Sequence, residues 1–370
     1  MEKPLRFHWS LSQAGDKLRR AQATTTMSGL FDIRQQIQVC RHAEKNGIES
    51  MLMATGFTRP DPLQLAIAIG LQTKKIKFMV ACRSGLISPT FYVQQLNTAS
   101  ALLPHRILIN VVCGHTPHEL RYYGDFLDHD ERYRRTGEFL TVCRGLWSGA
   151  CPYSFNGKYY KIENARIHTP FCGERESGPD IFVGGNSAEA ADLAIRHGSC
   201  LWRFPASPSD LEGQIGPVLH LGVEVGFLTS IIARPTRDES LAAATALIAS
   251  VGAEARAVHQ QFAAAVDSEG YRSVYEMALG DSAWITSWLW TGAVPYLGAP
   301  SIALVGSFEE IAEAIMLYKE MGITQFLFLG WPDVEEMDYF GRGVLPLIRA
   351  REREHHARLL AATRAQSRRA

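Results

Sequence analysis

The segment Val183-Gly184-Gly185-Asn186-Ser187 has the residue types of an anion-binding turn. Gly184 and Gly185 permit a tight turn and a close approach of the backbone to a ligand. Ser187 is placed to open a helix, whose free N–H groups and dipole attract an anion such as a phosphate. An ordinary strand-to-helix turn with Ser187 as its N-cap would use the same residues. The pattern alone therefore leaves two interpretations, a phosphate site and a plain turn.

Arg59 and Arg83 are candidates for holding an anionic group, because each follows a strand-like apolar run. A guanidinium can bind a carboxylate or a phosphate through two parallel hydrogen bonds, and burying it unpaired is costly. A structural ion pair is the alternative for each arginine.

A dense charged cluster from Asp128 to Tyr133 opens a helical pattern, with Asp130 as a suitable N-cap. Its His129 and Tyr133 can each donate a hydrogen bond to a phosphate. A solvated helix start explains the same residues.

Three further residues lie next to strand-like runs: His8, Cys113 and Trp331. His8 is a candidate polar group beside a substrate, although a lone histidine in an apolar strand is more often part of a core. Cys113 is a candidate nucleophile, and a buried inert thiol is the alternative. Trp331 and the tryptophans between 284 and 290 can shape a pocket or simply pack. The sequence contains no hydrolase elbow, Walker loop, zinc-protease motif or dinucleotide fingerprint.

The composition narrows the class of protein. Of 370 residues, 46% are hydrophobic and 21% are charged, which is typical of a globular chain. Lys plus Arg and Asp plus Glu both total 38, so no basic surface is expected for nucleic acid or an anionic membrane. No apolar run approaches the roughly 18 to 20 residues of a membrane span. Seven scattered cysteines without a C-x-x-C pair argue against a disulfide framework or a zinc site, and no secretory pattern opens the chain, which predicts a cytoplasmic protein.

Eight strand-like runs alternate with helical patterns along the chain. They cover residues 5–9, 48–53, 76–81, 107–112, 180–183, 200–204, 223–233 and 323–329. Such alternation predicts a parallel sheet, because parallel neighbours need crossover connections. Eight units favour a closed (β/α)₈ barrel, with an open doubly wound sheet as the alternative. In a barrel, the candidates other than the cluster from Asp128 to Tyr133 lie at the carboxyl ends of strands, where chemistry is performed.

We expect one barrel domain over residues 1–348 with two additions. Residues 149–179 contain Asn156-Gly157, which predicts a hairpin between aromatic strands. Residues 254–298 form a long insertion before the last unit, which predicts a mobile cover for the barrel mouth. Residues 349–370 predict a C-terminal helix or tail that is solvated and frays, with a subunit contact as the alternative.

Several segments in order resemble the bacterial luciferase-like flavin monooxygenases, and most closely the alkanesulfonate monooxygenase branch. The matching segments are 83–90, 110–114, 126–133, 155–158, 184–187, 303–306 and 330–332, and the resemblance extends over about residues 5–348.

The resemblance implies reduced FMN (FMNH2), supplied by a separate NAD(P)H-dependent flavin reductase, in a homodimer or homotetramer. The flavin would react with O2 at C4a to give a peroxide that transfers one oxygen atom to an organic substrate. Carried over by position, Tyr133, Gly184, Gly185, Asn186 and Ser187 would hold the FMN phosphate. Ala54, Thr55, Asn110 and Cys113 would lie near the isoalloxazine ring.

The substrate-facing positions depart from the sulfonate branch. Where that branch has His, Cys, Arg, His, Tyr and Arg, this chain has Ser12, Arg59, Leu228, Ser230, Trp331 and Leu297. A sulfonate would lack its compensating charges, and burying an unpaired anion is expensive. The resemblance therefore predicts retained flavin–oxygen chemistry on a different, more apolar substrate, with His8, Arg59, Arg83 and Trp331 around it. A deazaflavin (F420)-dependent oxidoreductase and a non-catalytic flavin-binding protein are the alternatives.

Overall fold

The computed structural model describes residues 3–11, 32–57, 59–114, 116–175, 177–251 and 253–367. Within these ranges, eight parallel strands close into a barrel, because the first strand pairs with the last and the last pairs with the seventh. In barrel order they are β1 (Arg6–Ser10), β2 (Ser50–Met53), β3 (Lys77–Cys82), β4 (Ile107–Val111), β7 (Ile181–Gly184), β8 (Cys200–Arg203), β9 (Glu224–Arg234) and β12 (Ile323–Leu329). The closed barrel confirms the predicted (β/α)₈ fold and rules out the open sheet.

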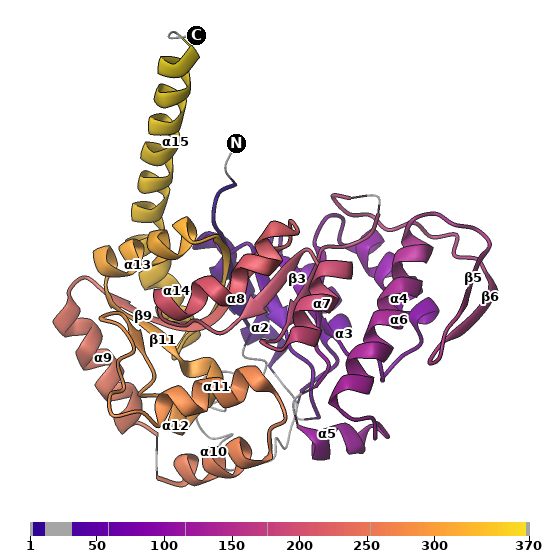
Figure 1. Cartoon of the computed structure of the whole chain (residues 1–370), viewed down its shortest axis with the longest axis horizontal. Coiled ribbons are helices and arrows are strands. Elements are labelled where there is room, and N and C mark those ends of the chain that lie inside the picture. Colours follow the sequence, from indigo (N-terminus) through magenta and orange to yellow (C-terminus); the bar gives the residue numbers. More distant parts are fainter. Residues whose placement is uncertain are drawn as a thin grey trace.

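Helices connect the strands and surround them (Figure 1). They are α2 (Ile33–Lys45), α3 (Pro62–Gly70), α4 (Pro89–Leu102), α5 (Pro117–Tyr122), α6 (His129–Trp147), α7 (Ala188–His197), α8 (Pro208–His220), α9 (Arg237–Ala249), α13 (Phe308–Glu320), α14 (Asp333–Tyr339) and α15 (Leu345–Ser367), with a π-helical turn at Phe340–Val344. Many begin where a side chain caps the first turn, as at Asp61 and Ser187, and two carry a full capping box at Thr236 and Ser307. None of the described helices combines the length and the hydropathy of a membrane-spanning segment.

The strands are buried on both faces, so their side chains divide between two cores. Alternate residues of a strand point to opposite faces. In β1, Phe7 and Trp9 join the large core between the strands and the helices. His8 lies between them and packs against the rings of Phe182 and Trp202, which belong to the cluster inside the barrel. The interior of the barrel is therefore filled by side chains rather than open from end to end.

Two strands that the sequence did not predict extend the sheet at the barrel mouth. β11 (Ala303–Ser307) pairs in parallel with Ser230–Arg234, the last part of β9, beyond the point where β8 ends. The short β10 (Leu289–Trp290) pairs antiparallel with β11. The long β9 therefore extends the barrel wall past the carboxyl end of β8, and β11, which follows the insertion, pairs with this extension.

The predicted hairpin is present, with a different turn. β5 (Tyr153–Asn156) and β6 (Lys161–Ala165) pair antiparallel, and Asn156 faces Lys161, so four residues form the loop instead of two. The Glu138 carboxylate accepts hydrogen bonds from three successive backbone N–H groups of this loop, at residues 158–160. A side chain from α6 thus fixes a loop that the Asn-Gly pair alone would close more tightly.

The insertion folds into short helices grouped together in Figure 1, α10 (Ala253–Ala265), α11 (Glu269–Ala278) and α12 (Val294–Leu297), followed by a 3₁₀ turn at Ala299–Ser301. Arg132 of α6 ties this insertion to the barrel: its Nη2 donates to Asp267 at 2.7 Å and its Nε to the Cys113 carbonyl at 2.9 Å. The last helix, α15, projects from the body of the molecule (Figure 1). Residues 368–370 of the expected tail lie outside the described residues.

Candidate active site

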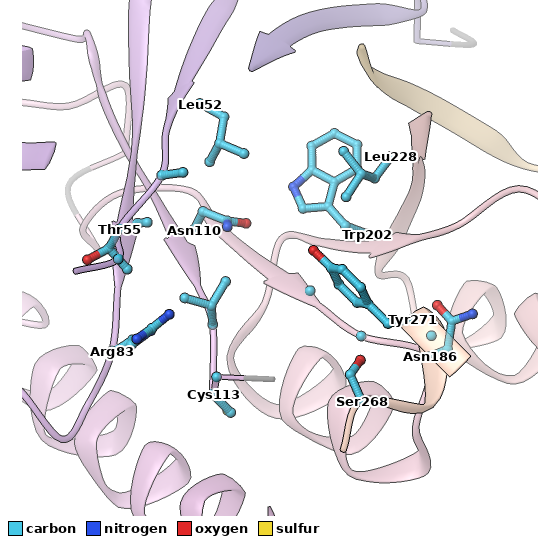
Figure 2. Close-up of a pocket in the computed structure, with 18 of the residues that line it drawn as sticks. Leu52, Thr55, Arg83, Asn110, Cys113, Asn186, Trp202, Leu228, Ser268 and Tyr271 are labelled. Atoms are coloured by element: carbon cyan, nitrogen blue, oxygen red, sulfur yellow. The ribbon is translucent and has the colours of Figure 1, made fainter. Parts of the chain in front are cut away.

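A cavity of about 360 Å³ lies at the carboxyl ends of the barrel strands. Figure 2 shows one wall with Leu52, Thr55, Arg83, Asn110 and Cys113, and the facing wall with Asn186, Trp202, Leu228, Ser268 and Tyr271. Ser268 and Tyr271 come from the insertion, so part of it covers the barrel mouth. Parallel strands bring their carboxyl ends to one edge, which is why residues distant in sequence meet here.

The glycine turn forms one end of this cavity. Gly184, Gly185 and Asn186 line it, and Ser187 caps α7 by accepting a hydrogen bond from the Ala190 N–H at 3.2 Å. A Cβ on Gly185, whose φ is +151°, would lie 2.6 Å from the Ala190 Cβ, so a side chain cannot fit there. A Cβ on Gly184 would meet no described atom within 4 Å, so this backbone faces open space. The turn is therefore accessible to a ligand.

Tyr133 joins the turn from α6. Its hydroxyl would lie 3.0 Å from a Cβ on Gly185 and is hydrogen bonded to the Ser187 side chain. Burial raises the pKa of Tyr133 well above its usual value, so the hydroxyl keeps its proton and can donate. The helix begins at His129 with Asp128 as its N-cap, which corrects the expected cap at Asp130. Ser187 itself is buried as a cap and is not part of the cavity wall.

Arg83 lies in the wall at the end of β3. Its side chain is 8% exposed, and its Nη1 donates to Glu119 Oε1 at 3.0 Å. Its Nε is buried and finds no hydrogen-bond partner among the described residues. Glu119, on the short helix α5, was missed by the sequence analysis because nothing local marks it as a partner of Arg83. Arg59, the other predicted cation, is exposed at the rim of the same cavity.

Arg203, at the end of β8, is a second buried guanidinium in this cavity. Its Nη1 donates to the Asn186 carbonyl at 3.4 Å, and its Nε has no partner in the described part of the chain. Burial lowers its pKa, and the nearby negative charge of Glu269 offsets this effect only in part. Trp202 Nε1 and Asn110 Oδ1 are also buried without partners across the described ranges. Four unpartnered polar atoms around one cavity are unusual, since buried polar groups are normally hydrogen bonded.

Cys113 lines the cavity, with its Sγ 3.5 Å from the Thr136 hydroxyl. Burial raises the pKa of the thiol to about 11, so it is protonated near neutral pH. The geometry favours the inert thiol over the nucleophile. Ala54, Thr55 and Asn110, which the resemblance assigns to the flavin ring, also lie in the wall.

His8 and Trp331 are not among the residues that line the cavity. His8 is fully buried inside the barrel, with Nδ1 2.7 Å from the Ser50 hydroxyl and Nε2 2.9 Å from Gln325 Oε1. Burial lowers its pKa to about 4, so it is neutral. Trp331 belongs to a separate apolar cluster with Trp290 and Leu329. The placement of His8 therefore corresponds to the alternative of a core histidine, and that of Trp331 to the alternative of a packing residue.

The residues that depart from the sulfonate branch are spread over the mouth. Leu228 lines the cavity, whereas the Ser230 hydroxyl donates to the Pro300 carbonyl at 2.8 Å and is buried. Leu297 packs beside the Trp331 cluster. Ser12 lies outside the described residues. The cavity thus presents an apolar side chain at Leu228, where the sulfonate branch has a cation.

The cavity fits a flavin mononucleotide on three observations. Gly185 leaves no room for a side chain. Two buried guanidinium groups lack a full set of acceptors, and an amide oxygen and an indole N–H lack partners, among the residues that the structure describes. A phosphate would compensate the positive charge beside α7, and a polar ring system can pair with Asn110 and Trp202.

Comparison with known proteins also gives proteins that use flavin-type cofactors. The family model described as luciferase-like monooxygenase matches residues 5–325. A riboflavin lyase solved with a modified FMN and riboflavin is 18% identical with a TM-score of 0.76, over 95% of this chain and 92% of that one. A long-chain alkane monooxygenase is 18% identical with a TM-score of 0.74, over 95% and 92%. An F420-dependent secondary alcohol dehydrogenase is 19% identical with a TM-score of 0.62, over 94% and 99%.

At such identities the likeness to these three structures establishes the fold alone. The family match is broader, because it runs from before β1 into β12 and includes every residue that lines the cavity except Leu327. The chain therefore belongs to the luciferase-like monooxygenase family.

Proposed function

We propose that this protein is a two-component monooxygenase that inserts one oxygen atom of O2 into an organic substrate, using reduced FMN from a separate flavin reductase. The observation that carries the proposal is the group of unpartnered buried polar atoms around the cavity that the glycine turn closes at one end, in a chain of this family. Reduced FMN would supply the activation of oxygen, which protein side chains do not provide.

Two groups of residues bind the flavin in this proposal. The turn at Gly184 and Gly185, with the Tyr133 hydroxyl and the Arg203 guanidinium, binds the phosphate. Asn110 and Trp202 offer an acceptor and a donor to the edge of the ring system.

The insertion excludes water from the cavity. Tyr271 and Ser268 close one wall, and the Arg132–Asp267 ion pair holds them there. Leu52, Leu228 and Leu327 give the substrate an apolar surface. A dry site strengthens every hydrogen bond to the ligand and protects reactive species from hydrolysis.

The test is an anaerobic titration of the protein with reduced FMN, followed by mixing with oxygenated buffer in a stopped-flow spectrometer. We expect tight binding, binding of reduced riboflavin at least about tenfold weaker because it lacks the phosphate, and a transient flavin species after mixing. Gly185→Ala is expected to abolish the binding, since its Cβ would collide with Ala190. Gly213→Ala, at an exposed helical position with open space around it, is the matched control.

Hydride transfer with a deazaflavin is the second candidate, because an F420-dependent dehydrogenase has the same fold. It predicts weak binding of reduced FMN, tight binding of reduced F420 and no oxygen consumption. Failure of both titrations would contradict an enzymatic role that depends on a flavin or a deazaflavin.

A further inference from the structure

Two buried arginines share the cavity, and each leaves the same edge of its guanidinium open. Arg83 uses Nη1 to reach Glu119, and Arg203 uses Nη1 to reach the Asn186 carbonyl. In both, Nε is buried and has no hydrogen-bond partner among the described residues. Nη2 donates to no described residue either, so the edge formed by Nε and Nη2 is unpartnered on each side chain.

The same chain shows what this edge holds when it is occupied. Arg6, at the opposite end of the barrel, donates from Nε and from Nη2 to the two oxygens of Glu49, both at 2.8 Å. This is the bidentate arrangement in which the planar fork of arginine matches a carboxylate. Arg83 and Arg203 present the same fork to a cavity instead of to a side chain.

The two forks belong to different parts of the wall. Arg203 lies beside Asn186 and the start of α7, where the proposed function places the FMN phosphate. Figure 2 shows Arg83 on the facing wall, across the cavity from Asn186, with its guanidinium directed between the walls. A phosphate bound at the glycine turn would occupy the first fork and leave the second one open.

The wall facing Arg83 is apolar at Leu228 (Figure 2), and Leu327 also lines the cavity, so both can contact a hydrocarbon body.

We propose that the organic substrate is a carboxylate whose two oxygens bind the Nε–Nη2 edge of Arg83, with its apolar body against Leu228 and Leu327. Glu119 is a positioning residue, because its bond to Nη1 aims the free edge of Arg83 into the cavity. The inference rests on the proposed function for the identity of the reaction, but the carboxylate site itself uses residues outside the phosphate turn.

The test compares three pairs of probes that differ in charge and not in shape: acetate and acetamide, phenylacetate and phenylacetamide, octanoate and octanamide. Their affinities are measured by calorimetry, for the full-length protein loaded with oxidised FMN and for the flavin-free protein. We expect the carboxylate to bind at least about tenfold tighter than its amide in at least one pair. Arg83→Met should remove that preference, and Arg83→Lys, which keeps the charge without the fork, should restore it in part.

Arg203→Met is the matched variant, since it removes the other buried fork. It should weaken FMN binding and, with FMN at saturation, leave the carboxylate preference within about threefold. The absence of a preference in all three pairs, or a preference that survives in a folded Arg83→Met protein, overturns the proposal. Loss of FMN binding with an intact carboxylate preference would instead contradict the proposed function alone.

Discussion

Both ends of the barrel carry arginine side chains, but those at one end are paired with carboxylates and those at the other keep unpartnered N–H groups among the described residues. At the amino ends of the strands, Arg6 is held by Glu49, and Lys77 bridges Glu49 and Glu174. At the carboxyl ends, Arg83 and Arg203 are buried more deeply, yet each keeps an unpartnered Nε within the described part of the chain. An open buried charge lowers stability, so its presence at one end marks a place where a ligand completes the structure.

The largest effect that would test this contrast is expected at the satisfied end. Arg6→Met should lower the free energy of unfolding by about 2–3 kcal/mol, because it leaves the Glu49 carboxylate partly buried without its fork. The affinity for FMN should stay the same. Chemical denaturation and flavin titration measure the two quantities, and a variant as stable as the parent would show that this end is not a stabilising one.

Arg203→Met should do the reverse. We expect the affinity for FMN to fall about 10- to 30-fold, the size of one charge-assisted contact, while the unfolding transition does not move downward. Arg121→Met, at an exposed position of α5, is the control for the loss of a positive charge. A fall in stability larger than the loss of FMN affinity would remove the distinction between the two ends.

The pH dependence sharpens the comparison further. Burial alone would raise the pKa of Glu49, but the hydrogen bonds and charge of Arg6 outweigh it and lower the pKa to about 2. Because the unfolded carboxylate takes up its proton first, this stabilisation is complete above about pH 4.5 and is lost as the pH falls towards 2. The stability gap between the wild type and Glu49→Gln should therefore close over that range. A gap that is constant with pH would assign the effect to packing.

The smallest effect is expected when both partners of the open pair are removed. Arg83→Met combined with Glu119→Gln should change the free energy of unfolding by less than about 1 kcal/mol, because a buried ion pair costs nearly as much in desolvation as it returns. Single variants serve as references for the coupling between the two side chains. A much larger fall in the free energy of unfolding of the double variant would show that Arg83 serves mainly to stabilise the fold.

Most of the fold could be predicted from the sequence, because its signals are local. Each barrel strand is an apolar run followed by a helix, many of these helices begin at a side-chain cap, and eight such units favour a closed barrel. β11 was missed as a strand because a four- or five-residue run such as Ala303–Ser307 becomes one only by pairing with the distant end of β9. The hairpin loop differed because Glu138, far away in sequence, holds it open.

The site was predicted less completely. The sequence does not show which inward-facing side chains are covered by others, or which distant segments complete the cavity wall. His8 faces the interior of the barrel, but the rings of Phe182 and Trp202 pack against it, and it does not line the cavity. Glu119 and Tyr271 come from a short helix and from the insertion, where no strand periodicity marks an inward direction. By contrast, the glycine turn and Tyr133 carry their signal in residue type, and the structure brings them together.

Arg132 gives the insertion an unusual form of attachment. Besides its bond to Asp267, this buried side chain donates to the backbone carbonyls of Cys113 and Leu127, so it remains anchored to the barrel whatever the insertion does. Outward movement of α11 has to break the ion pair but not the anchor, a cost on the order of 1.5–3 kcal/mol. Arg132 thus keeps a fixed position on the barrel when the ion pair is broken. Each time the insertion closes, Asp267 pairs with the same guanidinium, so the insertion returns to the same position over the barrel.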